Sequence, residues 1–267
     1  MKIPIYQVDA FTSRLFGGNP AAVCPLKEWL PDETMQAIGG ENNLSETAFF
    51  VRKGANFEIR WFTPAVEVDL CGHATLASGH VLFNHLGRPG RQITFQSKSG
   101  ELRVKKHKDL LFLDFPAFQP VAVDPPARLI KGLGRRPREV LKGRDFLAVF
   151  ESEEVIVNLD PDFAELKKLD CLGIIVTAGG RDSDFVSRFF APRAGINEDP
   201  VTGSAHTLLV PYWAKRLNKK KLHAFQVSRR RGELFCENLG SRVLIGGRSK
   251  TFFVGRIELT ESASLRV

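Results

Sequence analysis

Short runs of alternating apolar and polar residues recur along the chain and predict β-strands. The predicted strands are residues 3–8, 47–51, 57–62, 92–95, 110–115, 146–150, 155–158, 173–177, 185–190, 243–245 and 252–259. Two longer segments, 74–86 and 205–217, break this pattern because small or apolar residues would lie on nearly every side of a helix. A helix that is apolar most of the way round is a buried one. The pattern therefore predicts many strands wrapped around two buried helices.

The two predicted buried helices differ in one detail. Segment 74–86 is followed by Gly87, a residue that suits a helix C-terminal cap. Segment 205–217 contains Pro211, which should kink or disturb the helix locally. A further surface helix is predicted over residues 32–37, directly after a proline that favours a helix start.

The sequence repeats itself once, in an ordered set of strand, proline, acid, glycine and helix. The first copy comprises Arg60-Trp61-Phe62-Thr63-Pro64, the acidic loop 67–69 and Gly72-His73-Ala74. The second comprises Arg188-Phe189-Phe190-Ala191-Pro192, the acidic loop 198–199 and Gly203-Ser204-Ala205. The copies start 128 residues apart and reach their glycines 131 residues apart, so the second loop carries an insertion. We interpret the chain as two related halves.

Proline residues crowd the segment 115–126 and mark the expected junction between the halves. The N-terminal half is predicted to span residues 1–116, with about 255–267 returning to it, and the C-terminal half residues 117–254. The expected class is α+β, with each half a β-structure around a central helix. At 267 residues the chain is comfortable for two domains.

Composition narrows the class of protein. Hydrophobic residues make up 43% and charged residues 25%, which is ordinary for a globular chain. Because apolar runs stay well below the roughly 20 residues that cross a bilayer, no membrane partner is expected. The start reads as a strand and not as a secretion signal. The four cysteines are scattered, which argues against a zinc site or a disulfide framework and favours a cytoplasmic location.

The net charge is +8, and basic residues gather in the region 215–231. One interpretation is a phosphate-binding patch on this surface. The other is a solvated helix end, where cations favour the helix dipole. We favour the second interpretation and expect no nucleic-acid partner, because no nucleic-acid motif or interleaved aromatic residue accompanies the charge.

The two repeated glycine turns are the first candidate binding elements. A glycine that opens a helix lets a ligand approach the backbone, and the free N–H groups attract an anion. Gly72, with His73, and Gly203, with Ser204, would then hold a small carboxylate in a cleft between the halves. The alternative is that both turns are ordinary helix caps, for which Ser204 is well suited.

Four ionisable or nucleophilic residues are candidates for catalysis. Glu46 immediately precedes a buried strand, and partial burial should raise the pKa of its carboxyl group and suit acid/base work. His73 could exchange a proton with a substrate, and Asp199 lies just before a predicted helix. Cys71 could be an acidified thiol base, but Thr202 stands at the matching position of the second copy. Each of the four also has a plain structural interpretation, as a loop acid, a cap or a small buried residue.

The chain resembles the PhzF-like phenazine-biosynthesis isomerase family in five sequence blocks that follow the expected order. These blocks are Asp9-Ala10-Phe11, Gly17-Gly18-Asn19-Pro20-Ala21-Ala22-Val23, Asn43-Leu44-Ser45-Glu46-Thr47-Ala48-Phe49, Leu70-Cys71-Gly72-His73-Ala74-Thr75-Leu76-Ala77 and Asp199-Pro200-Val201-Thr202-Gly203-Ser204-Ala205. Any one block is weak evidence, whereas the five together are highly specific.

The resemblance implies the diaminopimelate-epimerase-like fold, in which each of two pseudo-symmetric halves is a β-barrel around a central α-helix. It implies that Glu46 is the acid/base, that His73 and Asp199 are essential, and that Gly72, Gly203 and Ser204 hold the substrate. The substrate class is a dihydro-hydroxyanthranilate-like cyclic amino acid, with no metal or organic cofactor, and the family is commonly homodimeric. Two rival hypotheses stay open, an amino-acid epimerase or racemase of the same fold, and a non-catalytic binder that uses residues 229–231.

Overall fold

The computed structural model describes residues 1–259, which form two compact units. Unit 1 comprises Met1–Phe16, Pro20–Leu113 and the chain from Arg248 onward; unit 2 comprises Gly17–Asn19 and Asp114–Gly247. The boundaries predicted from the sequence between the two halves lay after residues 116 and 254. The part of the predicted returning segment beyond residue 259 lies outside the described residues.

Unit 1 is a barrel of β-strands. Its strands are β1 (Lys2–Ala10), β2 (Asn19–Leu26), β3 (Glu46–Lys53), β4 (Asn56–Phe62), β5 (Glu67–Val68), β6 (Gln92–Ser97), β7 (Gly100–His107), β8 (Leu110–Pro116) and β18 (Ser249–Glu258). They pair in the order β18, β1, β2, β3, β4, β6, β7 and β8, and β5 pairs with the end of β4. The pairs β2–β3 and β4–β6 are parallel.

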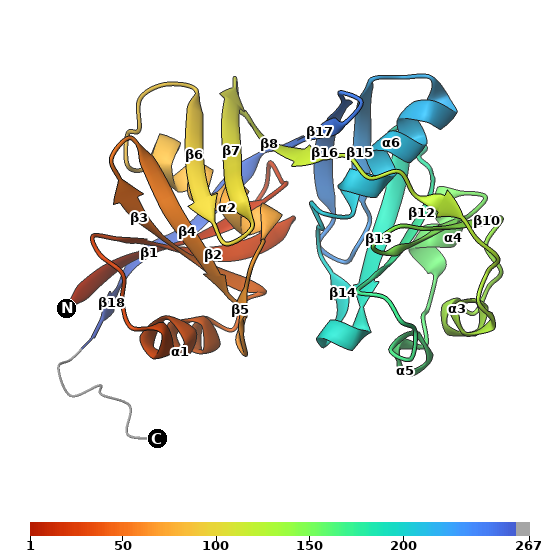
Figure 1. Cartoon of the computed structure of the whole chain (residues 1–267), viewed down its shortest axis with the longest axis horizontal. Helices are drawn as coiled ribbons and strands as arrows, with labels where there is room; N and C mark the ends of the chain where they lie inside the picture. The colour runs from red at the N-terminus through yellow and green to blue at the C-terminus, as the bar shows by residue number, and fades with distance from the viewer. Residues whose placement is uncertain (260–267) are drawn as a thin grey trace. The chain divides into compact units, whose positions relative to one another are not determined.

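Helix α2 (Gly72–Asn84) is the central helix of unit 1 (Figure 1). It contacts β1, β3, β7 and β18, and its residues from His73 to Phe83 are all buried. Gly79 allows the close approach to β7, since a Cβ there would lie 2.7 Å from Val104 Cγ1. The prediction of a buried helix here is confirmed, because an all-round apolar surface can only be satisfied inside the barrel.

Unit 2 repeats this plan. Its strands are β9 (Val121–Ala122), β10 (Glu139–Lys142), β11 (Phe146–Val149), β12 (Ile174–Gly179), β13 (Phe185–Ala191), β14 (Ile196–Asp199), β15 (Lys221–Gln226), β16 (Gly232–Asn238) and β17 (Arg242–Gly247). They pair in the order β9, β10, β11, β12, β13, β15, β16 and β17, with β14 beside β13. Helix α6 (His206–Leu217) contacts β15, β16 and β17, and it continues through Pro211.

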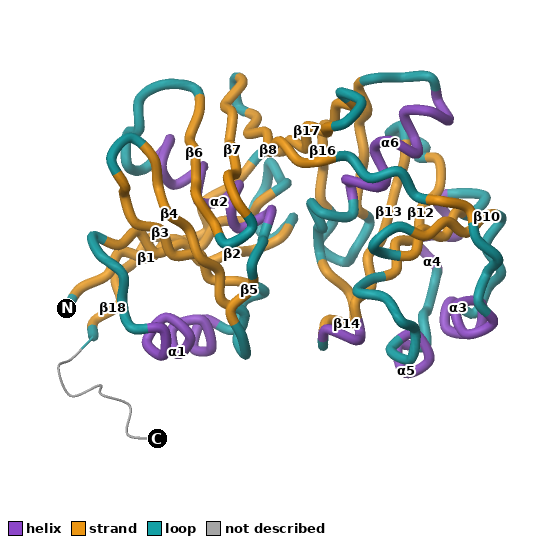
Figure 2. Tube along the Cα trace, viewed as in Figure 1, coloured by secondary structure: helices purple, strands orange, loops and turns teal. Residues whose placement is uncertain are grey.

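The remaining helices lie outside the barrels (Figure 2). They are α1 (Asp32–Asn42), α3 (Ala127–Leu133), α4 (Glu153–Asn158), α5 (Phe163–Leu166) and the 3-10 turn η1 (Pro192–Ala194). Helix α1 runs five residues beyond its predicted end, because Gly39 lets it approach β4 closely and a Cβ there would lie 3.1 Å from Phe62 Cβ. No helix among the described residues is long and apolar enough to span a membrane.

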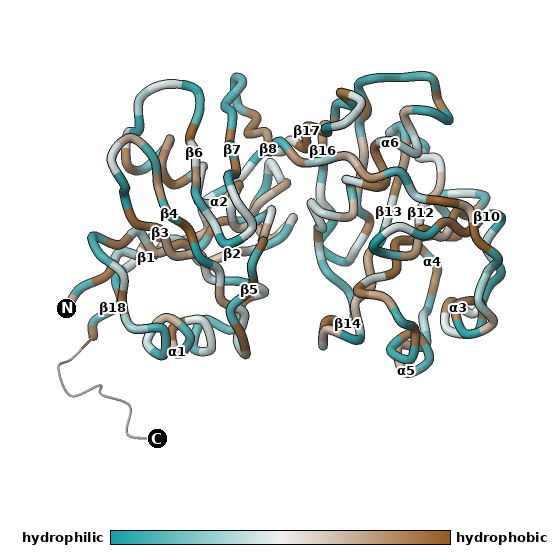
Figure 3. Tube along the Cα trace, in the orientation of Figure 1, coloured by the Kyte–Doolittle hydropathy of each residue, from teal (hydrophilic) through white to brown (hydrophobic). Residues whose placement is uncertain are grey.

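The predicted strand 155–158 is wrong, since these residues belong to helix α4. The Ser152 side chain accepts a hydrogen bond from the Val155 N–H and caps the helix, and Glu153 and Glu154 favour its first turn. The β-branched residues suggested a strand, but Ile156 is the buried residue that anchors the helix to the core. In contrast β11 and β12 are nearly continuous apolar strands. Figure 3 colours the chain by hydropathy, with hydrophobic segments in brown.

The repeated motif forms the same corner in each unit. In unit 1, Arg60 donates from Nε and Nη2 to the two oxygens of Glu67, both at 2.8 Å. In unit 2, Arg188 makes the same paired contact with Glu198 at 2.7 and 3.0 Å. The two ion pairs join β4 to β5 and β13 to β14, so the duplicated sequence produces a duplicated structure.

Candidate active site

Glu46 and His73 meet in unit 1. Glu46 is the first residue of β3 and pairs with Ala21 of the parallel strand β2, and His73 is the second residue of α2. His73 Nε2 lies 3.3 Å from Glu46 Oε2, and the two side chains are only 7% and 14% exposed. Sequence reasoning therefore identified two residues that the fold brings together from segments 27 residues apart.

His73 is held in its neutral form. Burial lowers the pKa of its imidazole to about 4, although a hydrogen bond to the backbone of Pro20 acts in the opposite direction. Its Nδ1 lies 3.5 Å from Cys71 Sγ. At neutral pH the ring therefore presents no positive charge to Glu46, and the contact is not an ion pair between charged partners.

The same corner of unit 1 could accept a metal ion. One ligand atom from each of Glu46, Cys71 and His73 lies within 4.8 Å of the others. Three protein ligands of oxygen, sulfur and nitrogen type suit zinc. An ion there would use the carboxylate as a ligand and so remove it as a free base.

Asp199 is the ionisable centre of unit 2. It ends β14, and its Oδ1 accepts a hydrogen bond from Asn19 Nδ2 at 2.9 Å, while the Thr202 hydroxyl donates to Oδ2. Burial raises the pKa of this carboxyl group to about 6, against the opposing effect of both hydrogen bonds. Asp199 therefore titrates close to neutral pH, where an acid/base group is useful.

Gln226 braces the loop that holds Asp199. Its side chain accepts from the Thr202 N–H and donates to the Asp199 carbonyl, both at 2.8 Å. Sequence reasoning missed this role because Gln226 lies 27 residues downstream in β15 without any local motif. Asn19 belongs to the family-like block that starts at Gly17, and this resemblance was the signal that could have identified it as a site residue.

The glycine turns open the two central helices. Gly72 is the first residue of α2, where backbone N–H groups have no intrahelical partner and suit an anion. In unit 2 the turn precedes α6, and the carbonyls of Gly203 and Ser204 accept from the N–H groups of His206 and Thr207. Gly72 thus lies beside His73 in unit 1, and Gly203 and Ser204 lie close in sequence to Asp199 in unit 2.

The model of the phenazine biosynthesis-like protein family (PhzC-PhzF) matches residues 8–255. The chain belongs to this family. This PhzF-family protein is 52% identical over 259 residues to a protein of Pseudomonas aeruginosa named an uncharacterized isomerase, with 97% of this chain and 100% of the relative covered.

Solved structures confirm the fold. A crystal structure of a PhzF-family protein from Enterococcus faecalis is 50% identical, with a TM-score of 0.96, and the match covers 97% of this chain and 100% of that one. A hydroxyproline epimerase from Agrobacterium vitis has a TM-score of 0.63 at 9% identity, covering 98% and 94% of the two chains. The second likeness concerns the fold alone. The PhzF-family protein thus has the predicted diaminopimelate-epimerase-like fold of two related β-barrel halves, each around a central helix.

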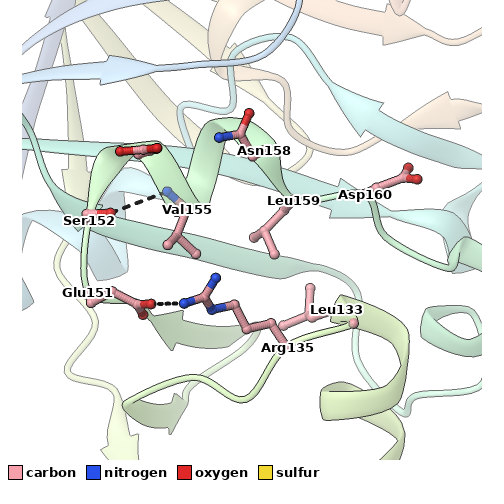
Figure 4. Close-up of a pocket in the computed structure, with 10 residues that line it drawn as sticks. Leu133, Arg135, Glu151, Ser152, Val155, Asn158, Leu159 and Asp160 are labelled. Atoms are coloured by element: carbon pink, nitrogen blue, oxygen red, sulfur yellow. Dashed lines mark hydrogen bonds and ion pairs between the residues drawn. The ribbon is translucent and has the colours of Figure 1, made fainter.

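A pocket of about 580 Å³ in unit 2 is formed where α3 ends and α4 begins (Figure 4). Its cation, Arg135, pairs with Glu151, and Ser152 is occupied as the α4 cap. The polar groups of this pocket are therefore engaged in contacts that stabilise the PhzF fold, and we assign no ligand to it.

The basic region 215–231 is also partly structural. Arg230 donates to the backbone carbonyls of Gly17 and Gly18, at 3.0 and 2.9 Å. The Arg231 guanidinium lies 4.3 Å from the centroid of the Phe225 ring. Reversing the charge of these arginines would therefore disturb unit 2 itself, which weakens that substitution as a test of the binder hypothesis.

Proposed function

We propose that this PhzF-family protein is a cofactor-independent isomerase that shifts a proton between carbons of a small carboxylate-bearing substrate. The observation that carries the proposal is the buried contact between Glu46 and a neutral His73. The proposed substrate class is a dihydro-hydroxyanthranilate-like cyclic amino acid, as the family resemblance implies.

Glu46 is proposed to act as the acid/base. As a carboxylate it removes a proton from an acidic C–H bond, and the electron pair of that bond moves into the conjugated system of the substrate. The protonated Glu46 then returns the proton to another carbon on the same face, which regenerates the carboxylate and leaves the substrate's composition unchanged. Water exclusion from this buried site would limit proton loss to solvent.

His73 is proposed to orient Glu46 and the substrate without adding charge. A neutral imidazole carries its N–H donor on one nitrogen and its acceptor on the other, and Nε2 is the nitrogen that faces Glu46. In a given tautomer Nε2 therefore serves one protonation state of the Glu46 carboxyl group. The helix start at Gly72 would receive an anionic substrate group. Asp199, Gly203 and Ser204 are assigned to the polar groups of the substrate on the strength of the resemblance.

The test uses purified protein and dihydro-hydroxyanthranilate in heavy water, followed by proton NMR. We expect conversion by the wild type, and a loss of about 10³-fold in Glu46→Gln, because the amide cannot accept the proton. Glu41→Gln is the matched control, since Glu41 is an exposed residue near the end of α1 and should tolerate the same change. A chelator should leave the wild-type rate unchanged.

Three outcomes would count against the proposal. Equal rates for wild type and Glu46→Gln would remove Glu46 from the mechanism. Loss of activity with chelator and recovery with zinc would make the Glu46, Cys71 and His73 cluster a metal centre. Deuterium uptake at a single inverted stereocentre would establish the rival epimerase reaction.

A further inference from the structure

Three lysines line a pocket of about 510 Å³ in unit 1, away from the start of α2. The pocket lies between the C-terminal part of α2, the β7–β8 hairpin and the start of β18. Its lysines are Lys106, Lys108 and Lys250, and its one acidic residue, Asp109, is paired with Arg248 at 2.6 Å. The volume lies within the range of about 300–1,000 Å³ that is usual for small-molecule sites.

The end of α2 does not account for this charge. A helix C-terminus carries the equivalent of about half a negative charge, so a single nearby cation offsets it. Lys106 already fills that place, since it lies over the Phe83 ring and donates to Asn84 Oδ1 at 3.3 Å. Lys108 and Lys250 are then in excess, and the pocket is electropositive.

A chain of hydrogen bonds fixes the polar groups that face the pocket. Because Lys106 can only donate, Asn84 must present its oxygen to Lys106 and its NH₂ to His80 Nδ1, at 2.9 Å. His80 is therefore protonated on Nε2 and donates to Thr251 Oγ1 at 2.9 Å. The Thr251 Oγ1 also lies 2.7 Å from His85 Nε2, which makes the next hydrogen bond of the chain.

This directed chain leaves donor groups for a ligand. Ser249 Oγ is buried and has no hydrogen-bond partner among the described residues. Together with the lysine ammonium groups, the lining offers many donors and little negative charge, which is what an oxyanion requires.

We propose that this pocket binds a small phosphate-bearing anion through Lys108, Lys250 and the hydroxyl of Ser249. Lysine ammonium groups bind phosphate as charged hydrogen-bond donors. The site is distinct from the Glu46–His73 contact, because His80 and His73 lie two turns apart on α2. The inference does not depend on the proposed isomerase reaction.

The test titrates the full-length protein with inorganic phosphate and, separately, with adenosine monophosphate at constant ionic strength in sodium chloride. Binding is followed by calorimetry and by the NMR signals of the His80 and His85 rings. We expect saturable binding at millimolar concentration or below, with both rings shifted. Tighter binding of the nucleotide would identify a phosphorylated metabolite as the ligand, and tighter binding of inorganic phosphate would identify the free ion.

The variant Lys108→Gln/Lys250→Gln should bind about 100-fold more weakly, since each charged hydrogen bond accounts for about tenfold. Lys27→Gln is the control, because Lys27 is exposed after β2 and outside the lining of the pocket. Absence of saturable ring shifts in the wild type would overturn the proposal without reference to any variant. The proposal would also be overturned if Lys27→Gln, which removes one charge, weakened binding by the same factor per charge as the double variant.

Discussion

Units 1 and 2 have the same barrel but carry their acidic groups at different positions. Phe62 of β4 pairs with Thr47 of β3, and the matching Phe190 of β13 pairs with Ile174 of β12. The residue before Thr47 is Glu46, whereas the residue before Ile174 is Gly173. Unit 2 therefore has a glycine where unit 1 has its proposed acid/base.

The reverse holds one strand away. Trp61 pairs with Val68 of β5, and the matching Phe189 pairs with Asp199 of β14. Unit 1 has an apolar residue where unit 2 has the half-buried carboxyl group of Asp199. The two units share their strands and the arginine–glutamate corner, and they differ in the positions of Glu46 and Asp199.

This difference separates the two enzymatic hypotheses. A racemase built from two equivalent bases would carry the same kind of group at matching positions of the two units. Here Thr202 stands opposite Cys71 in the repeat, and Gly173 stands opposite Glu46. The comparison favours one acid/base at Glu46 and a separate role for Asp199.

The largest expected effect on this comparison comes from Asp199→Asn. We expect kcat to fall about 100-fold, because the variant can no longer titrate near neutral pH. The variant should also be more stable than the wild type by about 2 kcal/mol at pH 7, because it removes a poorly solvated charge. Its amide oxygen can still accept from Asn19 Nδ2, and the Thr202 hydroxyl must turn to accept from the new NH₂. Kinetics and denaturant unfolding of the same samples measure the two effects.

The pH dependence gives the sign of the stability effect. The folded-state pKa of Asp199 is raised from 3.8 to about 6, so its contribution to stability is full below pH 4 and is lost as pH rises through 6. The advantage of Asp199→Asn should therefore appear between about pH 4 and 6 and stay constant above. Asp182→Asn, in an exposed loop of unit 2, is the control. A stability gain that is the same at pH 4 and pH 7 would contradict burial as its cause.

The sequence predicted those features that depend on local pattern. Alternation revealed strands such as β1, β3 and β4 but not β2, β7, β15 or β16. The apolar surfaces of α2 and α6 revealed two buried helices. Helix α4 was missed because its β-branched residues favour a strand, and only the Ser152 cap opposes them. Gln226 and the lysine pocket were missed because their partners come from distant segments, which a one-dimensional pattern does not contain.

A second, smaller effect is expected from Gly173→Ala. A Cβ at this position would lie 2.1 Å from Phe189 Cζ, and the Phe189 side chain is buried. We expect a loss of about 1–3 kcal/mol in the free energy of unfolding, since the ring must move within a packed core. Gly179→Ala, at the end of the strand β12 that Gly173 precedes, is the control because its Cβ would meet open space.

Chemical denaturation of both glycine variants measures this effect. Equal stability would show that unit 2 has room for a side chain where unit 1 carries Glu46. The absence of an acid at Gly173 would then reflect chemistry alone and not packing.

The smallest effect is expected from Cys71→Thr, which copies the unit 2 residue into unit 1. Cys71 is the N-cap of α2, and threonine is a favourable capping residue. We therefore expect the free energy of unfolding to rise by up to about 1 kcal/mol. The kcat should stay within about fivefold of the wild type, because the proton is carried by Glu46 and not by the thiol. A loss of about 100-fold or more, with correct folding, would instead make Cys71 a base. Unit 1 would then supply two acid/base groups, Glu46 and Cys71, to one substrate. The epimerase hypothesis, which needs a second base, would have that base in the Cys71 thiol.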